Sequence, residues 1–285
     1  MFKLIDGKSH SQEIRIEIAE RVKAFKAKCG REVGLAVVLI GSDPASQIYV
    51  RNKIKGCEET GIKSYAYYLP DETTQAQAEE LVLSLAENSA IHGILVQLPL
   101  PKHLNSEKLL SLIPDSKDVD GFSEHNIGNL CMNRDCLVAC TPSGVMQMLK
   151  REGVEVKGKH AVVIGRSNIV GKPMAMLLLN SDATVTVCHS KTVNLKEICR
   201  TADILVSAIG VAKFVTADMV KEGAVVIDIG MNRDVNGKLC GDVDFENVKD
   251  KCSYITPVPG GVGPMTIGML LYNTVVSAER SVNGG

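Results

Sequence analysis

The stretch HAVVIGRSNIVGKPMAMLLLN, residues 160–180, decides the fold of this chain. It reads as a buried strand at residues 160–165, a glycine-containing turn and an apolar helix. Further apolar runs typical of strands follow at residues 183–188, 203–210 and 224–230. Strands that alternate with helices indicate a parallel sheet covered on both faces and joined by right-handed crossovers. We therefore predict an α/β unit in the second half of the chain.

The same alternation occurs in the first half. Residues 35–40, 64–69 and 92–98 are typical of short buried strands, and residues 44–60 and 73–88 have helical spacing. An irregular stretch, residues 113–141, separates this series from the second one. The sequence therefore predicts an α/β fold with two domains and a boundary near the end of that stretch.

Composition excludes several classes of protein. Lysine and arginine number 32 against 33 aspartates and glutamates, so the basic excess of a nucleic-acid binder is missing. The first residues, MFKLIDGKSHSQEI, do not resemble a signal peptide, and no apolar run has the length of a membrane span. Nine cysteines without a CxxC pair do not form a secreted disulfide framework. We expect a cytoplasmic, reduced protein that binds neither nucleic acid nor membrane.

The turn after residues 160–164 is a candidate dinucleotide site. A glycine turn between a strand and a helix presents backbone N–H groups to a pyrophosphate. The GxGxxG pattern is absent, because Ser167 stands where its second glycine would be, and a glycine turn can also serve geometry alone. The next strand is followed by His189, Ser190 and Lys191 instead of the acid that binds the ribose of NAD. Arg166, Ser190 and Lys191 therefore favour NADP, unless Arg166 is an ordinary surface arginine.

Three polar side chains in the first half are candidates for chemistry. Tyr49 and Lys53 share one helix face at i and i+4, and a lysine in a pocket can exchange protons. The alternative is that Tyr49 and Lys53 are an ordinary solvated pair on the helix surface. Gln97 ends a predicted strand, where ligands bind in open α/β sheets, and Asp120 lies in a turn. The structural alternatives are that Gln97 only satisfies backbone groups at the strand end and that Asp120 only stabilises its turn.

Two further segments have unusual composition. Residues 256–266, TPVPGGVGPMT, combine prolines that fix the backbone with glycines that allow a planar ligand to approach closely. This density of proline and glycine is too specialised for a plain linker. Cys131, Cys136 and Cys140 do not have the spacing of a zinc site, so we expect no metal.

Six motifs carry a resemblance to a known family. They are YVRNK (49–53), GILVQLPLP (93–101), KDVDGF (117–122), GRSNIVGKP (165–173), CHSKT (188–192) and TPVPGGVGPMTIGML (256–270). In this order and spacing they resemble the bifunctional methylenetetrahydrofolate dehydrogenase/methenyltetrahydrofolate cyclohydrolase family over nearly the whole chain. That family oxidises 5,10-methylenetetrahydrofolate with NADP and hydrolyses the methenyl product to 10-formyltetrahydrofolate.

The resemblance implies a role for each motif. Lys53 handles the proton of the hydrolysis, Gln97 tunes it, Tyr49 stacks beside the aminobenzoyl ring and Asp120 binds the pterin. The implied catalytic residues are therefore Lys53, Gln97, Tyr49 and Asp120. The implied substrate-binding residues are these four with Val96, Leu98, Pro259, Gly260, Gly261, Val262 and Gly263. The implied cofactor-binding residues are Gly165, Arg166, Ser167, Ser190, Met231 and Thr266.

The resemblance also implies an architecture. Residues 1–140 form a folate-binding catalytic domain, residues 141–264 a Rossmann-like NADP-binding domain, and a cleft lies between them. The C-terminal helix, residues 265–285, packs back on the first domain, and the enzyme is a homodimer with tetrahydrofolate derivatives as its small-molecule partners. The relative strength of the two activities and a strict preference for NADP over NAD are not readable from these motifs.

Two other hypotheses remain at this point. The Tyr-x-x-x-Lys pair also occurs in short-chain dehydrogenases, but there the glycine turn precedes it, whereas here the turn follows by more than a hundred residues. A non-catalytic regulator that binds NADP or folate is the second alternative. A pure binding protein would not require Lys53 and Gln97, so loss of activity with retained binding in Lys53→Met would distinguish the two.

Overall fold

The computed structural model describes residues 2–283 and divides into two compact units. Unit 1 contains residues 141–266 with residues 2–11 and 130–133, and unit 2 contains residues 12–129, 134–140 and the segment from residue 267 onward. The compact units differ from the predicted domain limits at three places, of which the shortest is residues 265–266, which belong to unit 1. Residues 2–11 join unit 1 because Lys3 pairs with Tyr254, and Leu130 joins it because its carbonyl accepts the Asn180 side-chain amide at 2.8 Å. Residues 1, 284 and 285 of the predicted segments lie outside the described residues.

Unit 2 is built on a three-stranded parallel sheet of order β3-β2-β4. The predicted strands at residues 35–40 and 64–69 are confirmed within one residue, but β4 is shorter than the predicted 92–98. Gln97 nevertheless continues the ladder, because its N–H donates to the Val38 carbonyl at 2.9 Å. The elements of this unit are β2 (Gly34–Ile40), α2 (Pro44–Thr60), β3 (Lys63–Leu69), α3 (Gln75–Glu87), β4 (Gly93–Val96), α4 (Ser106–Leu110), α5 (Glu124–Cys131), and most of α1 (Gly7–Cys29) and α10 (Val262–Asn283).

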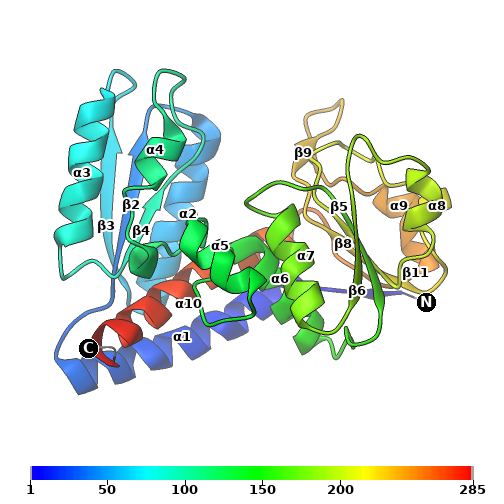
Figure 1. Cartoon of the computed structure of the whole chain (residues 1–285), viewed down its shortest axis with the longest axis horizontal. Helices are drawn as coiled ribbons and strands as arrows, with labels where there is room; N and C mark the ends of the chain where they lie inside the picture. The colour runs from blue at the N-terminus through cyan, green and yellow to red at the C-terminus, as the bar shows by residue number, and fades with distance from the viewer. Residues whose placement is uncertain (1, 284–285) are drawn as a thin grey trace. The chain divides into compact units, whose positions relative to one another are not determined.

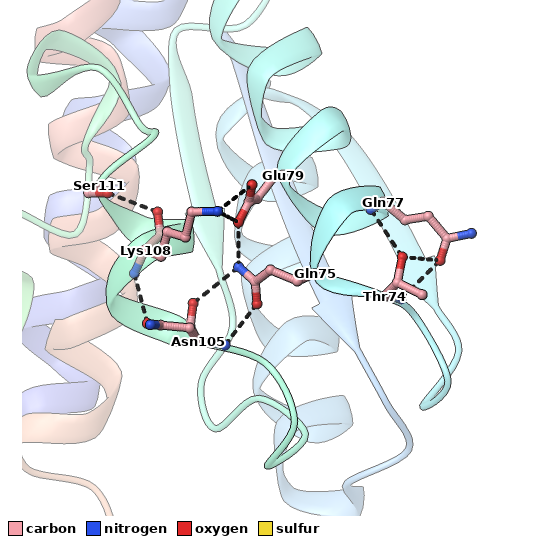
Figure 2. A network of polar contacts seen from close by, with 7 residues as sticks. All are labelled: Thr74, Gln75, Gln77, Glu79, Asn105, Lys108 and Ser111. Atoms are coloured by element: carbon pink, nitrogen blue, oxygen red, sulfur yellow. Dashed lines mark hydrogen bonds and ion pairs between the residues drawn. The ribbon is translucent and has the colours of Figure 1, made fainter.

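Helix ends in unit 2 follow the local sequence. Asp43 caps α2 by accepting the Ser46 N–H at 2.7 Å, and α2 stops at Gly61, whose φ of 77° suits glycine. Thr74 and Gln77 form a capping box at the start of α3. Figure 2 shows how the next turns of α3 hold α4. The bonds run from Gln75 to Glu79 and Asn105, from Lys108 to Glu79 and Asn105, and from Ser111 to the Lys108 carbonyl.

Two long helices, α1 and α10, lie side by side in unit 2 (Figure 1), joined by the Arg21–Glu279 ion pair at 2.6 Å. No helix was expected over residues 7–29, yet a buried stripe of Ile14, Ile18 and Val22 runs along α1 at helical spacing. Within residues 2–283 no helix has the length and apolar character to cross a membrane.

The stretch 113–141 is less irregular than predicted. It contains a 3-10 turn at Asp115–Lys117, helix α5 and the first residues of α6 (Cys140–Arg151). Helix α5 has an apolar stripe too short for periodicity to reveal, since it spans eight residues.

Unit 1 contains a six-stranded sheet of order β1-β11-β8-β7-β5-β6 in which all pairings are parallel. The predicted α/β fold with a parallel second sheet is confirmed. Besides α6, the elements are β1 (Lys3–Leu4), β5 (His160–Ile164), α7 (Gly171–Asn180), β6 (Thr184–Cys188), α8 (Leu195–Cys199), β7 (Ile204–Ser207), β8 (Ala224–Asp228), β9 (Asn232–Arg233), β10 (Leu239–Cys240), α9 (Phe245–Val248) and β11 (Cys252–Ile255).

The strand order of unit 1 reverses direction at β5. The chain passes from β5 to β6 on one side and then returns to β7 on the other. Right-handed crossovers therefore place α7 and α8 on opposite faces of the sheet (Figure 1). Open α/β sheets bind ligands at such a reversal, outside the carboxyl ends of the strands. The carboxyl ends of β5, β6, β7 and β8 thus mark where a ligand of unit 1 would lie.

His92 makes the stability of unit 2 depend on pH. The ring is 3% exposed, accepts the Gly34 N–H at 3.0 Å and meets Phe25 edge-on. Burial, with the nearby positive charges of Arg31 and Lys117, lowers the pKa of His92 to about 4. Because the unfolded ring titrates near pH 6.5, the unfolded state binds a proton between pH 6.5 and 4 that the folded state does not. The contribution of the neutral His92 ring to the free energy of unfolding is therefore complete above pH 6.5 and is lost as the pH falls from 6.5 to 4.

We expect the free energy of unfolding to fall by about 2 kcal/mol more between pH 7.5 and 5 in the native chain than in His92→Gln. Glutamine keeps an acceptor for Gly34 but does not titrate. The measurement is urea unfolding at both pH values. The exposed His125 supplies the control, since His125→Gln should keep the native pH dependence. Equal pH dependence in His92→Gln and the native chain would contradict the assignment.

Candidate active site

Lys53 and Gln97 form a direct pair in unit 2. Helix α2 presents Tyr49 and Lys53 one turn apart, and β4 delivers Gln97 to the carboxyl end of the sheet. The Lys53 Nζ donates to Gln97 Oε1 at 2.9 Å, and Gln97 Nε2 donates to the Leu98 carbonyl at 2.7 Å. The second bond fixes the amide, so its oxygen faces the lysine.

The charge state of Lys53 is perturbed by its surroundings. Burial lowers the pKa of Lys53, and the negative charge of Asp120 opposes that shift. Burial also raises the pKa of Asp120 to about 6, although the lysine charge lowers it. The pKa of the Cys140 thiol is raised well above its ordinary value by burial. An amine that gives up its proton more easily than usual and an enclosed carboxylate thus share one environment, which suits proton transfer.

The loop that carries Asp120 is held by its other residues. Lys117 donates to the Ala86 and Asn88 carbonyls at the end of α3, at 2.7 and 2.9 Å. The buried Asp118 accepts from the Gly121 N–H, the Ser123 N–H and the Asn126 side chain. Asp118 is therefore the turn residue. Across residues 2–283 the Asp120 carboxylate makes no hydrogen bond, which leaves it available to a ligand.

Two residues outside the predicted set support this loop. Asn273 on α10 donates to the Val119 and Val138 carbonyls at 2.8 and 2.9 Å, and Cys140 Sγ donates to the Val119 carbonyl at 3.2 Å. Both therefore fix the residue that precedes Asp120. Asn273 could have been noticed as a polar residue inside the apolar run GMLLYNTVV.

Other predicted residues of unit 2 have different surroundings. Tyr49 is half-buried, and burial raises the pKa of its phenol. Val96 is 2% exposed within the core, so its side chain is closed to a ligand and only its backbone is available. Leu98 is partly exposed and supplies the carbonyl that holds Gln97.

In unit 1 two glycines pack the turn between β5 and α7 together. Gly165 has a φ of 124°, and a Cβ there would lie 2.3 Å from the Ala208 carbonyl oxygen. A Cβ on Gly171 would lie 2.3 Å from the Gly165 carbonyl oxygen. Both positions need glycine because backbone atoms fill the space of a side chain. This close packing brings the N-terminus of α7 against the end of β5.

The turn offers unpaired donors that fit the phosphates of a dinucleotide. Ser167 Oγ accepts the Val170 and Gly171 N–H groups at 3.2 and 3.3 Å. The four N–H groups of residues 166–169 have no acceptor within residues 2–283. Ile164 and Cys188 are paired in register, so the exposed Arg166 and Ser190 each stand two residues beyond neighbouring strands. Free N–H groups at a helix start beside exposed basic residues fit NADP phosphates.

The remaining predicted residues of unit 1 lie on the loop after β8, in the turn before α10 and at the start of α10. Gly261 donates its N–H to the Pro257 carbonyl at 2.9 Å, and Gly260 has a φ of 108°, so residues 257–261 form a tight turn before α10. Pro259 is exposed, Val262 and Gly261 are buried, and Gly263 is partly exposed. Met231 is 47% exposed after β8, and the Thr266 hydroxyl lies 3.0 Å from that of Thr141.

Within residues 2–283 no group of three histidine, cysteine or acidic side chains could hold a metal ion. Cys131, Cys136 and Cys140 are free thiols that differ in burial: Cys131 is exposed, Cys136 is partly buried and Cys140 is buried.

Comparison with known proteins identifies the two halves of the chain separately. Residues 5–120 match the tetrahydrofolate dehydrogenase/cyclohydrolase catalytic domain, and residues 139–282 match the NAD(P)-binding domain of that family. The bifunctional protein FolD of Campylobacter concisus is 58% identical over 280 residues, which cover 98% of this chain and 99% of the relative.

Two solved structures are also similar. The bifunctional FolD methylenetetrahydrofolate dehydrogenase/cyclohydrolase of Campylobacter jejuni is 51% identical with a TM-score of 0.96, and the match covers 99% of this chain and all of that one. The Trypanosoma brucei methylenetetrahydrofolate dehydrogenase-cyclohydrolase, complexed with NADP and an inhibitor, is 42% identical with a TM-score of 0.94 and 99% coverage of both chains. These matches, together with the two α/β units and the order of the sequence motifs, show that this chain belongs to the tetrahydrofolate dehydrogenase/cyclohydrolase family.

Proposed function

We propose that the chain carries out both reactions of its family through the residues described above. It is an enzyme that oxidises 5,10-methylenetetrahydrofolate with NADP and hydrolyses 5,10-methenyltetrahydrofolate to 10-formyltetrahydrofolate. The observation that supports its own residues in these roles is the Lys53–Gln97 bond of 2.9 Å beside Asp120. In short-chain dehydrogenases the glycine turn precedes the Tyr-x-x-x-Lys pair, whereas here the turn follows it. A protein that only binds its ligands has no need of a lysine whose pKa is lowered.

The hydrolysis needs one group that can take and return a proton. Water adds to the methenyl carbon, and the neutral Lys53 amine takes the proton that the water loses. When the bond from that carbon to the pterin ring nitrogen breaks, Lys53 returns its proton to that nitrogen. The hydroxyl of the adduct becomes the formyl carbonyl and releases its own proton to water, so the formyl group stays on the other nitrogen and the reaction yields one proton. Gln97 holds the Nζ in place throughout, because its own amide is bound to the Leu98 carbonyl.

The oxidation needs orientation more than acid–base groups. NADP held at the turn of residues 165–169 and beside Ser190 would supply the acceptor for a hydride from the methylene carbon, and the folate nitrogens would stabilise the resulting cation. Asp120 accepts the two hydrogen bonds of the amino-pyrimidine edge of the pterin, which explains why its carboxylate has no structural partner. Tyr49 packs beside the aminobenzoyl ring. Pro259, Gly260, Gly261, Val262 and Gly263 line the folate, while Met231 and Thr266 contact the cofactor.

The choice of NADP over NAD follows from the ends of β5 and β6. Arg166 and Lys191 are exposed, and within residues 189–194 no acid is present to bind a ribose hydroxyl. The first experiment measures reduction of NADP and NAD in parallel with methylenetetrahydrofolate, and follows methenyl hydrolysis directly. Turnover with NADP well above NAD supports both proposals. Turnover with NAD alone overturns the cofactor choice, and absence of both activities in folded protein overturns the function.

Gln97→Glu should slow the hydrolysis because it raises the pKa of Lys53. A carboxylate in place of the amide would raise the pKa of Lys53, so less of the neutral amine is present near pH 7. We expect the hydrolysis rate to fall by about 100-fold at pH 7 and to recover as the pH rises. A pH–rate profile for hydrolysis is the measurement. The control is Gln77→Glu, since glutamate satisfies a capping box equally well. A variant profile that overlays the native one would contradict the role of Gln97.

Assembly and location complete the proposal. The chain forms a homodimer, and one edge of the unit 1 sheet supports this because β6 pairs on one side only and carries Val187, which is 39% exposed. Sedimentation velocity would decide, and a monomer at micromolar concentration would overturn it. The enzyme acts in the cytoplasm, which is supported by nine free thiols among the described residues.

A further inference from the structure

Asp242 is a buried carboxylate that the reactions above do not use. It is 0% exposed and follows the β9–β10 hairpin. Its Oδ2 accepts the Ile209 and Gly210 N–H groups at 2.8 and 3.3 Å, and its Oδ1 accepts the Val211 N–H at 3.0 Å. A single side chain thus satisfies three consecutive backbone donors. A buried carboxylate is costly unless such donors surround it, so its place fixes the conformation of the loop.

The same carboxylate also holds the segment after β8. Its Oδ1 accepts the Asn232 side-chain amide at 2.9 Å, next to Met231. Its Oδ2 accepts the hydroxyl of Ser207, the last residue of β7, at 3.1 Å. Asp242 therefore joins the loop after β7 to the loop after β8.

A second buried aspartate fixes Asp242 itself. Asp228 Oδ1 accepts the N–H groups of Gly230 and Asp242, both at 2.9 Å, and its Oδ2 accepts the Val243 N–H at 2.8 Å. A Cβ on Gly230 would lie 2.1 Å from Asp242 Oδ1, and one on Gly241 would lie 1.8 Å from Asp228 Oδ2. The two carboxylates fill the space beside these glycines, so neither loop can shift independently.

The position of these loops in the sheet indicates what they serve. They follow β7 and β8, whereas the phosphate turn with Arg166 follows β5, and Ser190 and Lys191 follow β6. A dinucleotide that places its pyrophosphate at the reversal between β5 and β7 has one half over β6 and the other half over β7 and β8. Ser190 and Lys191 after β6, with Arg166 on the neighbouring turn, assign the adenosine half to the side of β6. The nicotinamide half therefore lies over the loops that Asp242 holds.

We infer that Asp242 is a positioning residue for the nicotinamide half of NADP, acting through the backbone of residues 209–211 and the segment around Met231. This inference rests on the proposed use of NADP. Asp242→Asn replaces one oxygen by an NH₂ group. Because both oxygens accept backbone N–H groups, either orientation of the amide sets a donor against a donor.

The test compares two ligands by calorimetric titration. NADP carries both halves, and 2′,5′-ADP carries only the adenosine half. For Asp242→Asn we expect the Kd of NADP to rise at least tenfold and that of 2′,5′-ADP to change less than twofold. Methenyl hydrolysis, whose proton-transfer pair Lys53 and Gln97 lies in unit 2, should stay within twofold and report a folded protein.

Control variants separate this role from a general loss of stability. Asp203 lies at the opposite end of β7 and accepts the His160 N–H at 2.9 Å, so Asp203→Asn makes the same chemical change beside the sheet without touching the loops. It should leave both Kd values within twofold of native. Asn232→Ala removes one bond to Asp242 and should weaken NADP binding in the same direction by a smaller factor, even if Asp242→Asn does not fold.

Three outcomes would overturn the inference. Equal weakening of NADP and 2′,5′-ADP in Asp242→Asn would indicate a domain-wide defect. An unchanged Kd for NADP in a folded Asp242→Asn would show that the loops do not need the carboxylate. Native protein that binds neither ligand would overturn the proposed cofactor itself, and the inference with it.

Discussion

Replacement of Lys53 by methionine is expected to lower the rate of methenyl hydrolysis by about 10³-fold, within the range measured for loss of a general acid–base group. Methionine keeps the unbranched apolar stem of lysine but has no proton to exchange. Gln97 would lose its donor, yet its bond to the Leu98 carbonyl remains. The loss should therefore appear in kcat more than in the KM for the folate. The measurement is direct hydrolysis of 5,10-methenyltetrahydrofolate, with NADP binding as a check on the fold.

Lys55 provides the matched control for this variant. It lies on the same helix, is 72% exposed and approaches Glu59 at 3.9 Å. An exposed pair of this kind contributes little to stability, so Lys55→Met should keep native hydrolysis and native unfolding. Near-native hydrolysis by Lys53→Met would show that another group carries the proton.

Gly171→Ala is expected to weaken NADP binding by about 100-fold, equivalent to about 2.7 kcal/mol. The added methyl group would lie 2.3 Å from the Gly165 carbonyl oxygen and 2.7 Å from the Arg166 nitrogen. Both are backbone atoms, so the turn must open and the N–H groups of residues 166–169 lose their common direction. Calorimetric titration with NADP measures the effect, and methenyl hydrolysis should be preserved.

Gly128→Ala shows what the same substitution does where space is available. Gly128 lies in α5, and a Cβ there would meet no atom within 4 Å. Alanine also favours a helix over glycine, so the free energy of unfolding should rise by up to about 1 kcal/mol while NADP binding stays native. If Gly171→Ala bound NADP as tightly as Gly128→Ala, the close packing of the phosphate turn would not be needed for binding.

The fold was predictable where the sequence has continuous apolar runs or apolar residues at regular spacing. Residues 35–40 and 161–164 are apolar throughout because both faces of a parallel strand are covered, and both runs lie in strands as predicted. The glycine turn after β5 was predictable for the same reason, since Gly165 and Gly171 stand where a strand meets a helix. Charge and composition excluded classes of function but could not select one.

Other features depend on contacts between distant residues. In α1 charged positions dilute the stripe of Ile14, Ile18 and Val22, and the helix is fixed by what covers that stripe. Asp118 and Asp120 are equivalent in the sequence KDVDGF, and their roles separate only because the donors of Asp118 come from residues 121–126. Asn273 reaches the same loop from 154 residues away, a distance that no local pattern reveals.

Helix α10 completes unit 2 with residues that are synthesised after unit 1. Unit 2 takes Asn273 from a segment that follows the whole of unit 1, so the ribosome releases unit 1 before the Asp120 loop can receive its last support. A nascent chain stopped at residue 266 could complete the dinucleotide-binding sheet but would leave the Val119 carbonyl without Asn273. The support that Asn273 gives the Asp120 loop is therefore synthesised after the last strand of unit 1, so the dinucleotide-binding sheet can form before the catalytic unit is complete.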